Sequence, residues 1–229
     1  MQIIGMLGGM SWESSALYYR LLNEEARRRL GGTSSAPSIL WTVDFTEVER
    51  LQVAGDWDGA GALLADAARR VEGAGAELLL LCTNTMHKVA AAIEAAVDIP
   101  FLHIADVTAA AIVADGRCTV GLLATRYTME QAFYRDHLRD GFGIDVLVPD
   151  EADRDEVHRI IYEELALGIF TDASRRRCAA IVDALCDRGA EGVVLGCTEI
   201  ELLVPHEGDD RLYPSARLHA LAAVEAALA

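Results

Sequence analysis

Short apolar runs alternate with longer amphipathic stretches along the chain. Runs such as 2–7 and 77–81 are almost wholly apolar, which is typical of strands buried on both faces of a parallel sheet. Stretches such as 13–30 and 58–72 repeat apolar residues at three- and four-residue spacing, which predicts helices with one buried face. Because the two kinds of segment alternate, the pattern predicts parallel βαβ units and an α/β fold.

The same criteria place the other predicted elements. Further strands are expected at 38–43, 100–103, 118–123, 144–148 and 192–196. Further helices are expected at 86–96, 105–114, 128–139, 153–167 and 173–187, with a last helix from Ser215. No apolar run reaches the ~18 residues that a membrane-spanning helix needs, so no membrane partner is expected.

The two halves of the chain carry similar sequence in the same order. IGMLGG at 4–9 aligns with VGLLAT at 120–125. The stretch 75–83 aligns with 189–198, and both contain Gly-Ala-Glu, an apolar run and Cys-Thr. Any two βα units can share glycine and apolar strands, but the recurrence of these short motifs at nearly constant spacing favours duplication of one α/β unit.

Duplication predicts two pseudo-symmetric, three-layer α/β domains with parallel sheets and an active site in the cleft between them. The first domain is expected over 1–103 and the second over 104–209, which agrees with the usual size of domains. The remaining residues, 210–229, are expected to form a C-terminal helix that packs back on the first domain.

Charge and cysteine content limit the classes of partner. The chain has 36 acidic and 20 basic residues, a net charge of −16, which argues against nucleic acid and against anionic membrane surfaces. Its five cysteines are odd in number and widely spaced, unlike a secreted disulfide framework. The N-terminus lacks the basic region of a secretory signal, so a cytoplasmic protein is expected.

The basic residues also bear on cofactors. Lys88 is the one lysine, and the other 19 basic residues are arginine. A pyridoxal phosphate enzyme needs a lysine for its Schiff base, so this composition argues against that cofactor. The sequence also lacks CxxC and HExxH motifs and zinc-ligand spacing. We therefore expect neither a cofactor nor a metal.

Cys82 and Cys197 are the strongest chemical feature of the sequence. Each follows a predicted strand in its half of the chain, and ligands of parallel sheets bind beyond the carboxyl ends of strands. The start of a helix after each cysteine predicts a lowered thiol pKa and backbone N–H groups for a carboxylate. A single such cysteine is more often a small buried residue. As a pair flanking one cleft, they predict acid/base groups on opposite faces of one carbon, which stereoinversion requires. The other three cysteines lack this setting and are expected in or near the core: Cys118, Cys178 and Cys186.

Three motifs spread over nearly the whole chain resemble the aspartate/glutamate racemase family. They are GGMSWES at 8–14, CTNTMHK at 82–88 and LGCTEI at 195–200. The opening motif is most similar to the branch of aspartate and broad-specificity amino-acid racemases. The resemblance implies cofactor-independent racemisation of an amino-acid substrate, catalysis by Cys82 and Cys197, and often a homodimer.

The resemblance also implies substrate contacts. Met10 corresponds to a substrate-contacting loop, and Arg50 and Gln52 correspond to residues that recognise the substrate side chain. Contacts with the α-carboxylate and ammonium group fall on Thr83, Asn84, Thr85, Thr198 and Glu199. Ordinary helix capping is the alternative role for the residues after each cysteine, and a solvated surface position is the alternative for Arg50. His87 lies five residues after Cys82, where it can either tune that cysteine or cap the helix, and capping is the favoured expectation.

Two departures from the family pattern bear on specificity. The second half has no lysine for a distal carboxylate, which predicts that neutral amino acids are accepted beside aspartate and glutamate. Pro214 stands where relatives carry an acidic residue before the last helix. The motifs leave open a hydantoin racemase, a maleate-type isomerase or a decarboxylase. A non-catalytic small-ligand binding protein is a further alternative, against which the retention of both cysteines argues.

Overall fold

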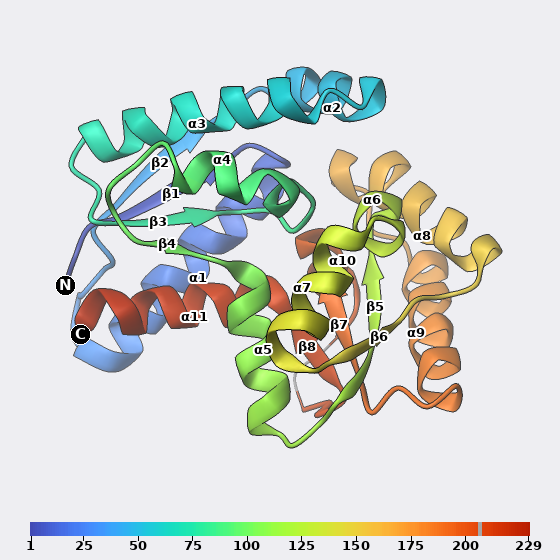
Figure 1. Cartoon of the computed structure of the whole chain (residues 1–229). Helices are drawn as coiled ribbons and strands as arrows, with labels where there is room; N and C mark the ends of the chain where they lie inside the picture. Colours follow the sequence, from blue (N-terminus) through green and yellow to red (C-terminus); the bar gives the residue numbers. More distant parts are fainter. Residues whose placement is uncertain (206–207) are drawn as a thin grey trace. The chain divides into compact units, whose positions relative to one another are not determined.

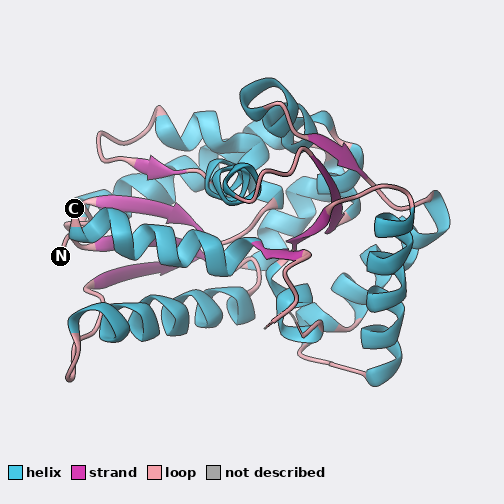
Figure 2. Ribbon diagram, turned by 90° about the horizontal axis from the view of Figure 1, so that it is seen from below, coloured by secondary structure: helices cyan, strands magenta, loops and turns pink. Residues whose placement is uncertain are grey.

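The computed structural model describes residues 1–205 and 208–229. The chain divides into two compact units, residues 1–104 together with 219–229, and residues 105–218. It passes from the first unit to the second within helix α5 (Ile104–Ala114) and returns within helix α11 (Ser215–Leu228). Each unit holds one parallel four-stranded sheet with flanking helices (Figure 1 and Figure 2), so the predicted α/β fold is confirmed.

The sheet of the first unit has the order β2-β1-β3-β4. Its strands are β1 (Ile4–Gly8), β2 (Ser38–Thr42), β3 (Leu78–Leu81) and β4 (Phe101–Leu102). The two central strands, β1 and β3, are buried at every position, because helices cover both faces of the sheet. Helix α3 (Trp57–Gly73) lies on one face, and α1 (Trp12–Leu30) and α11 lie on the other (Figure 1).

The sheet of the second unit has the order β6-β5-β7-β8. Its strands are β5 (Thr119–Ala124), β6 (Asp145–Leu147), β7 (Gly192–Gly196) and β8 (Leu212–Pro214). Taken in chain order, both sheets place their second strand at one edge, then the first, third and fourth. Helices of this unit include α6 (Arg126–Glu130), α7 (Ala132–Phe142), α8 (Glu151–Glu163), η2 (Leu165–Leu167), α9 (Asp172–Asp187) and α10 (Thr198–Leu203). Equal strand order is what duplication of one α/β unit produces.

Several elements differ from those expected. The sequence pattern missed helix α2 (Phe45–Ala54), in which Val48, Leu51 and Gln52 form a narrow buried face among charged residues. Asp44 starts this helix by accepting a hydrogen bond from the Thr46 amide at 3.0 Å. The helix expected at 86–96 is a 3₁₀ helix, η1 (Thr85–Val89), followed by the short α4 (Ala90–Glu94), and the one expected at 128–139 is divided between α6 and α7.

Strand β8 was also missed, because it is three residues long and contains Pro214. It pairs with β7 at the edge of its sheet, where the missing N–H of proline is tolerated. The proline therefore fits the fold before α11. Among the described residues, no helix is both long and apolar enough to cross a membrane.

Candidate active site

Cys82 lies at the carboxyl end of β3. Its backbone N–H donates to the Leu7 carbonyl at 2.9 Å, which extends the pairing of β3 with the central strand β1. The Thr83 N–H then turns back to the Leu81 carbonyl at 2.9 Å. Because the turn follows a fully buried strand, the Cys82 side chain has no exposed surface.

Cys197 occupies the matching place in the second unit. It follows β7 and is the N-terminal cap residue of helix α10, whose Ile200 N–H donates to the Cys197 carbonyl at 3.1 Å. The Cys197 thiol donates to Oε2 of Glu199 at 3.0 Å, and both side chains are buried. This cysteine therefore has a carboxylate in direct contact with its proton.

Burial is the largest influence on the pKa of both thiols. It raises the pKa of Cys82 above the usual range of a thiol. Burial also raises the pKa of Cys197, and the negative charge of Glu199 adds to that effect. The backbone N–H groups of Glu199 and Ile200 lower the pKa of Cys197, but they are outweighed. The expected lowering of both thiol pKa values is thus wrong for this structure, because a short helix start does not replace the lost hydration.

The loop after β1 carries Met10 and is held tightly. Gly9 has φ +94°, and a Cβ there would lie 2.3 Å from the Val43 carbonyl oxygen, so this position requires glycine. The Gly9 N–H donates to Ser15 Oγ at 2.8 Å, and that hydroxyl donates to the Ser11 carbonyl at 3.1 Å. Met10 is buried and belongs to the apolar core that also contains Met86 of η1.

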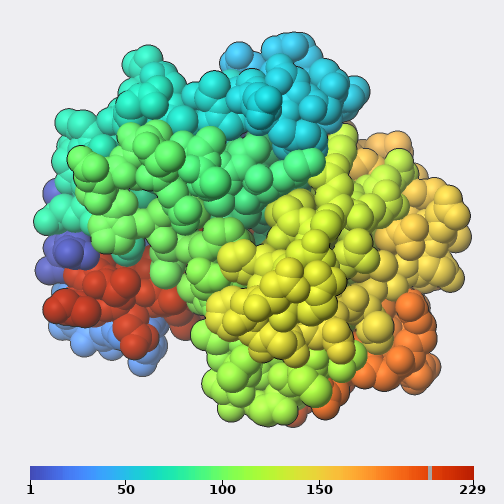
Figure 3. Space-filling model, viewed as in Figure 1, coloured from blue at the N-terminus to red at the C-terminus, as the bar shows by residue number. Residues whose placement is uncertain are grey.

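Helix α2 presents Gln52 and Arg50 in opposite directions. Gln52 is buried, and its amide donates to the Met86 sulfur at 3.0 Å, next to Thr85. Arg50 lies two residues earlier, about 200° around the helix, and is exposed. Helix α2 lies on the surface of the unit (Figure 3). The structure therefore places Gln52 beside the helix that follows Cys82, whereas Arg50 lies on the exposed side of α2. Contact between Arg50 and a substrate stays a prediction.

The remaining predicted contact residues belong to the two cysteine loops. In the first unit, Thr83, Asn84 and Thr85 follow Cys82 directly and are all buried. Asn84 precedes η1, but its side chain makes no capping hydrogen bond to that helix among the described residues. In the second unit, Thr198 and Glu199 are buried in the first turn of α10. That both groups contact one substrate stays a prediction.

Two polar residues near the cysteines have roles that the sequence did not indicate. His87 of η1 contacts the Thr83 carbonyl and, at the start of α5, the Ile104 amide, rather than an end of its own helix. Glu201 of α10 is buried and accepts hydrogen bonds from the amides of Ala216 at 2.6 Å and Arg217 at 3.3 Å. It thereby caps the first turn of α11. Two acidic residues, Glu199 and Glu201, interrupt the mostly apolar run 192–204, and this interruption was the available signal.

Burial raises the pKa of Glu201 to about 8, although the two amides and the Ser215 hydroxyl lower it. The carboxyl group is therefore much less acidic than usual.

The structure also bears on cofactor and metal binding. Lys88 Nζ lies 3.9 Å from the centre of the Trp57 ring, and burial lowers the pKa of Lys88.

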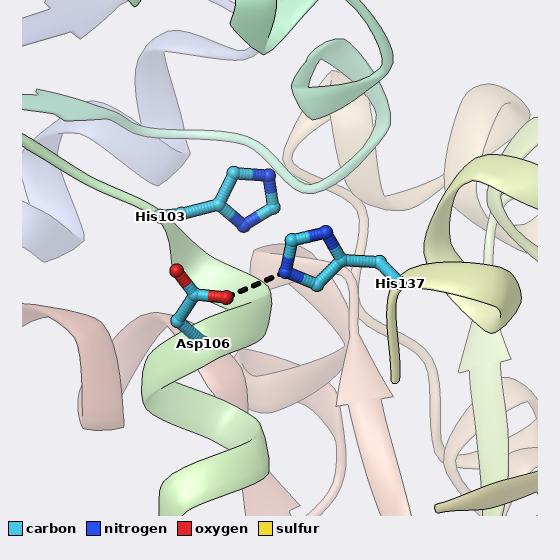
Figure 4. Close-up of side chains that lie close together, drawn as sticks. All are labelled: His103, Asp106 and His137. Atoms are coloured by element: carbon cyan, nitrogen blue, oxygen red, sulfur yellow. Dashed lines mark hydrogen bonds and ion pairs between the residues drawn. The ribbon is translucent and has the colours of Figure 1, made fainter. Parts of the chain in front are cut away.

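In the second unit, His137 Nε2 lies 2.5 Å from Asp106 Oδ1 (Figure 4). Figure 4 also draws His103, which belongs to the first unit. Within either unit taken alone, the described residues include no group of three metal-ligating side chains.

A family model for Asp/Glu/hydantoin racemases matches residues 7–226. The chain belongs to this family. The resemblance found in the three sequence motifs is thereby confirmed, and racemase-family membership implies an isomerase activity.

Solved structures of racemase relatives agree with this assignment. A candidate Asp/Glu racemase from Yersinia pestis is 50% identical, with a TM-score of 0.91 over 100% of both chains. An aspartate racemase homologue from Pyrococcus horikoshii OT3 is 33% identical, with a TM-score of 0.85 over 100% of both chains. The aspartate racemase of Picrophilus torridus shares the fold at 16% identity, with a TM-score of 0.78 over 99% of this chain and 94% of its own.

The chain also resembles an uncharacterized protein from Pectobacterium carotovorum subsp. carotovorum. The two are 36% identical over 106 residues, which is 46% of this chain and 69% of the relative.

The raised pKa of Glu201 predicts a pH dependence of stability. Between about pH 4.5 and about pH 8, the folded protein binds more protons at this site than the unfolded chain, so stability falls as the pH rises. Glu201→Gln removes this titration and should flatten the slope of the unfolding free energy, measured by urea denaturation. Glu191→Gln is the control, since the pKa of Glu191 is lowered by the Cys118 and Thr119 amides. An unchanged slope in Glu201→Gln would contradict the assignment.

The contact between Glu199 and Cys197 predicts a change in thiol acidity. Glu199→Gln removes a negative charge beside the thiol and should lower the pKa of Cys197 by about one pH unit or more. The measurement is the pH profile of iodoacetamide labelling at Cys197, resolved by peptide mass spectrometry. Exposed Cys118 in the same protein provides the internal control. A Cys197 profile that moves no more than that of Cys118 would refute the prediction.

Proposed function

We propose that this member of the racemase family interconverts L- and D-amino acids by proton transfer between Cys82 and Cys197. One observation carries the proposal. The two thiols hold the same place in two units with the same strand order, each at the carboxyl end of its third strand. Racemisation needs two acid/base groups on opposite faces of the α-carbon, and a duplicated cysteine site supplies two equivalent groups.

The proposed reaction moves one proton on each face of the α-carbon. It starts from the thiolate form of Cys197, although burial and the Glu199 charge both favour the thiol form. The thiolate then takes the α-proton of the substrate and becomes a thiol again, leaving a carbanion. The buried Cys82 thiol donates its proton to the opposite face of that carbanion and becomes a thiolate. Reversal of the last two steps converts the other enantiomer.

The buried polar groups around the cysteines suit an amino-acid substrate. Hydroxyl groups of Thr83, Thr85 and Thr198 and the amide of Asn84 can bind the α-carboxylate and ammonium group. Binding of both groups orients the α-hydrogen and lowers the entropy lost on reaching the transition state. Burial of the same groups favours transfer of protons to the substrate over exchange with bulk water.

The proposed reaction uses no cofactor. The one lysine, Lys88, lies against Trp57, which supports chemistry that does not use a Schiff base. A homodimer and a cytoplasmic location stay predictions from the family resemblance and the composition.

Arg50 and Gln52 are the proposed determinants of specificity. Arg50 is exposed, and no described residue holds it in an ion pair or hydrogen bond, so its guanidinium can pair with a distal carboxylate. Gln52 is buried beside Met86 and can bind an uncharged polar side chain. The combination supports a tolerant enzyme that accepts aspartate or glutamate together with some neutral amino acids.

Removal of either thiol tests the mechanism. Cys82→Ala and Cys197→Ala should each lower racemisation by about 10²- to 10⁴-fold, because each deletes one acid/base group. Each single variant should still exchange the α-proton of one enantiomer with deuterated solvent, and the two variants should act on opposite enantiomers. The assay uses protein dialysed against chelator, with chiral chromatography for racemisation and mass spectrometry for deuterium uptake.

The remaining cysteines provide the controls. Cys118→Ala, Cys178→Ala and Cys186→Ala should retain most of the activity, since none of the three lies at the carboxyl end of a strand. The expectation that all three lie in or near the core is wrong for Cys118, which is exposed. Loss of activity in these variants while Cys197→Ala stays active would contradict the proposal. Deuterium uptake by substituted hydantoins but by no amino acid would assign the protein to another branch of the family.

Substitution of Arg50 tests the proposed specificity. Arg50→Ala should lower kcat/KM for aspartate and glutamate by about 10- to 100-fold and leave neutral amino acids much less affected, because one charge-assisted ion pair is lost. Arg69→Ala, which removes another exposed arginine of the first unit, paired on the surface with Asp66, is the control. Equal losses on acidic and neutral substrates would show that Arg50 has a structural role.

A further inference from the structure

His87 connects the loop after Cys82 to Ile104, the first residue of helix α5. Its Nδ1 lies 2.7 Å from the Thr83 carbonyl oxygen, one residue beyond the cysteine. Its Nε2 lies 3.2 Å from the amide nitrogen of Ile104, where helix α5 begins. The imidazole is buried, and its ring stacks near those of Phe101 and His103. One side chain thus joins two backbone segments that are 21 residues apart in the sequence.

The chemistry of these two partners determines the proton position on the ring. A carbonyl oxygen only accepts, so Nδ1 carries the hydrogen and donates to Thr83. A backbone N–H only donates, so Nε2 is the acceptor for Ile104. Both contacts are satisfied together only by a neutral ring with its hydrogen on Nδ1. His87 is therefore an oriented link between these segments.

A second histidine, His219, holds the same stretch of chain, and its ring lies edge-on to that of His87 with the centroids 6.1 Å apart. His219 of α11 donates from Nε2 to the Leu102 carbonyl at 2.8 Å. Its Nδ1 lies 2.8 Å from the Tyr18 hydroxyl. His219 is fully buried, and burial lowers its pKa to about 4, so it is also neutral. The stretch 102–104 is thus fixed at Leu102 by one histidine and at Ile104 by the other.

We propose that His87 is a positioning residue for Cys82. The helix that follows the loop, η1, has five residues and the poorer hydrogen-bond geometry of a 3₁₀ helix, so its backbone holds the loop weakly. The His87 side chain supplies the missing constraint by fixing the peptide between Thr83 and Asn84. That peptide sets the place of the Cys82 thiol. This inference rests on the function proposed above.

Isosteric variants can separate the two contacts of His87. The amide nitrogen of asparagine takes the place of Nδ1, so His87→Asn keeps the donor for Thr83 and loses the Ile104 contact. The amide oxygen of glutamine takes the place of Nε2, so His87→Gln keeps the acceptor for Ile104 and loses the Thr83 contact. His87→Phe fills the space and loses both.

The assay measures Cys82 alone, in a Cys197→Ala protein. The parent exchanges the α-proton of one enantiomer with deuterated solvent, followed by mass spectrometry and expressed per folded protein. His87→Gln and His87→Phe should lower this exchange by about 10- to 100-fold, because a catalytic group displaced by about 1 Å can lose that much rate. His87→Asn should stay within a few-fold of the parent.

Two controls distinguish positioning from general stabilisation. In a Cys82→Ala protein, His87→Gln should change exchange of the other enantiomer by Cys197 about twofold at most. His219→Asn in the Cys197→Ala protein releases Leu102 without touching Thr83, so it should lower the Tm and leave exchange by Cys82 nearly unchanged.

Several results would overturn the inference. One is an equal loss of exchange at both cysteines. A second is a loss in His219→Asn as large as that in His87→Gln, and a third is full exchange in His87→Gln. If neither single-cysteine parent exchanges the α-proton of any amino acid, the proposed function fails and this inference fails with it. Exchange in both parents with no response to His87→Gln refutes the positioning role alone.

Discussion

Backbone pairing of parallel strands determines where each thiol lies. The bond from the Cys82 amide to the Leu7 carbonyl continues the pairing of β3 with β1 by one residue beyond the strand. In the second unit, β7 pairs with β5 up to Gly196, and Cys197 follows. Both strands lie in the centre of their sheets and are covered by helices, so the cysteine at each strand end is buried. Position and burial are therefore two consequences of one arrangement.

Burial has a chemical consequence for both cysteines. A buried thiol resists ionisation, and the groups that affect the thiol pKa differ between the two units. Burial is the cause of the raised pKa at Cys82, whereas at Cys197 the negative charge of Glu199, whose Oε2 lies 3.0 Å from the thiol sulfur, adds to the effect of burial. The duplicated fold thus contains two sites that match in position and differ in electrostatics.

In each unit, a different side chain from the helix after the cysteine forms a hydrogen bond with the start of a later helix. In the first unit, His87 accepts the amide of Ile104 at the start of α5. In the second unit, Glu201 accepts the amide of Ala216 at the start of α11. Each anchor reaches the helix that follows the last strand of its own sheet. In each unit, a buried side chain on the short helix after the cysteine thus accepts a hydrogen bond from a backbone amide that the later helix leaves unpaired.

The sequence by itself determined the features that depend on short spacing. Alternating apolar runs and amphipathic stretches predicted the α/β fold, and repeated motifs predicted two cysteines at equivalent strand ends and membership of the family. The narrow apolar face of α2 and the short β8 were not predictable, because their stability comes from packing against other segments. The partners of His87 and Glu201, and the raised pKa values of the thiols, were decided by tertiary structure alone. Burial and hydrogen bonds between distant residues exist only after the segments have packed, so they cannot be inferred from the local periodicity of the sequence.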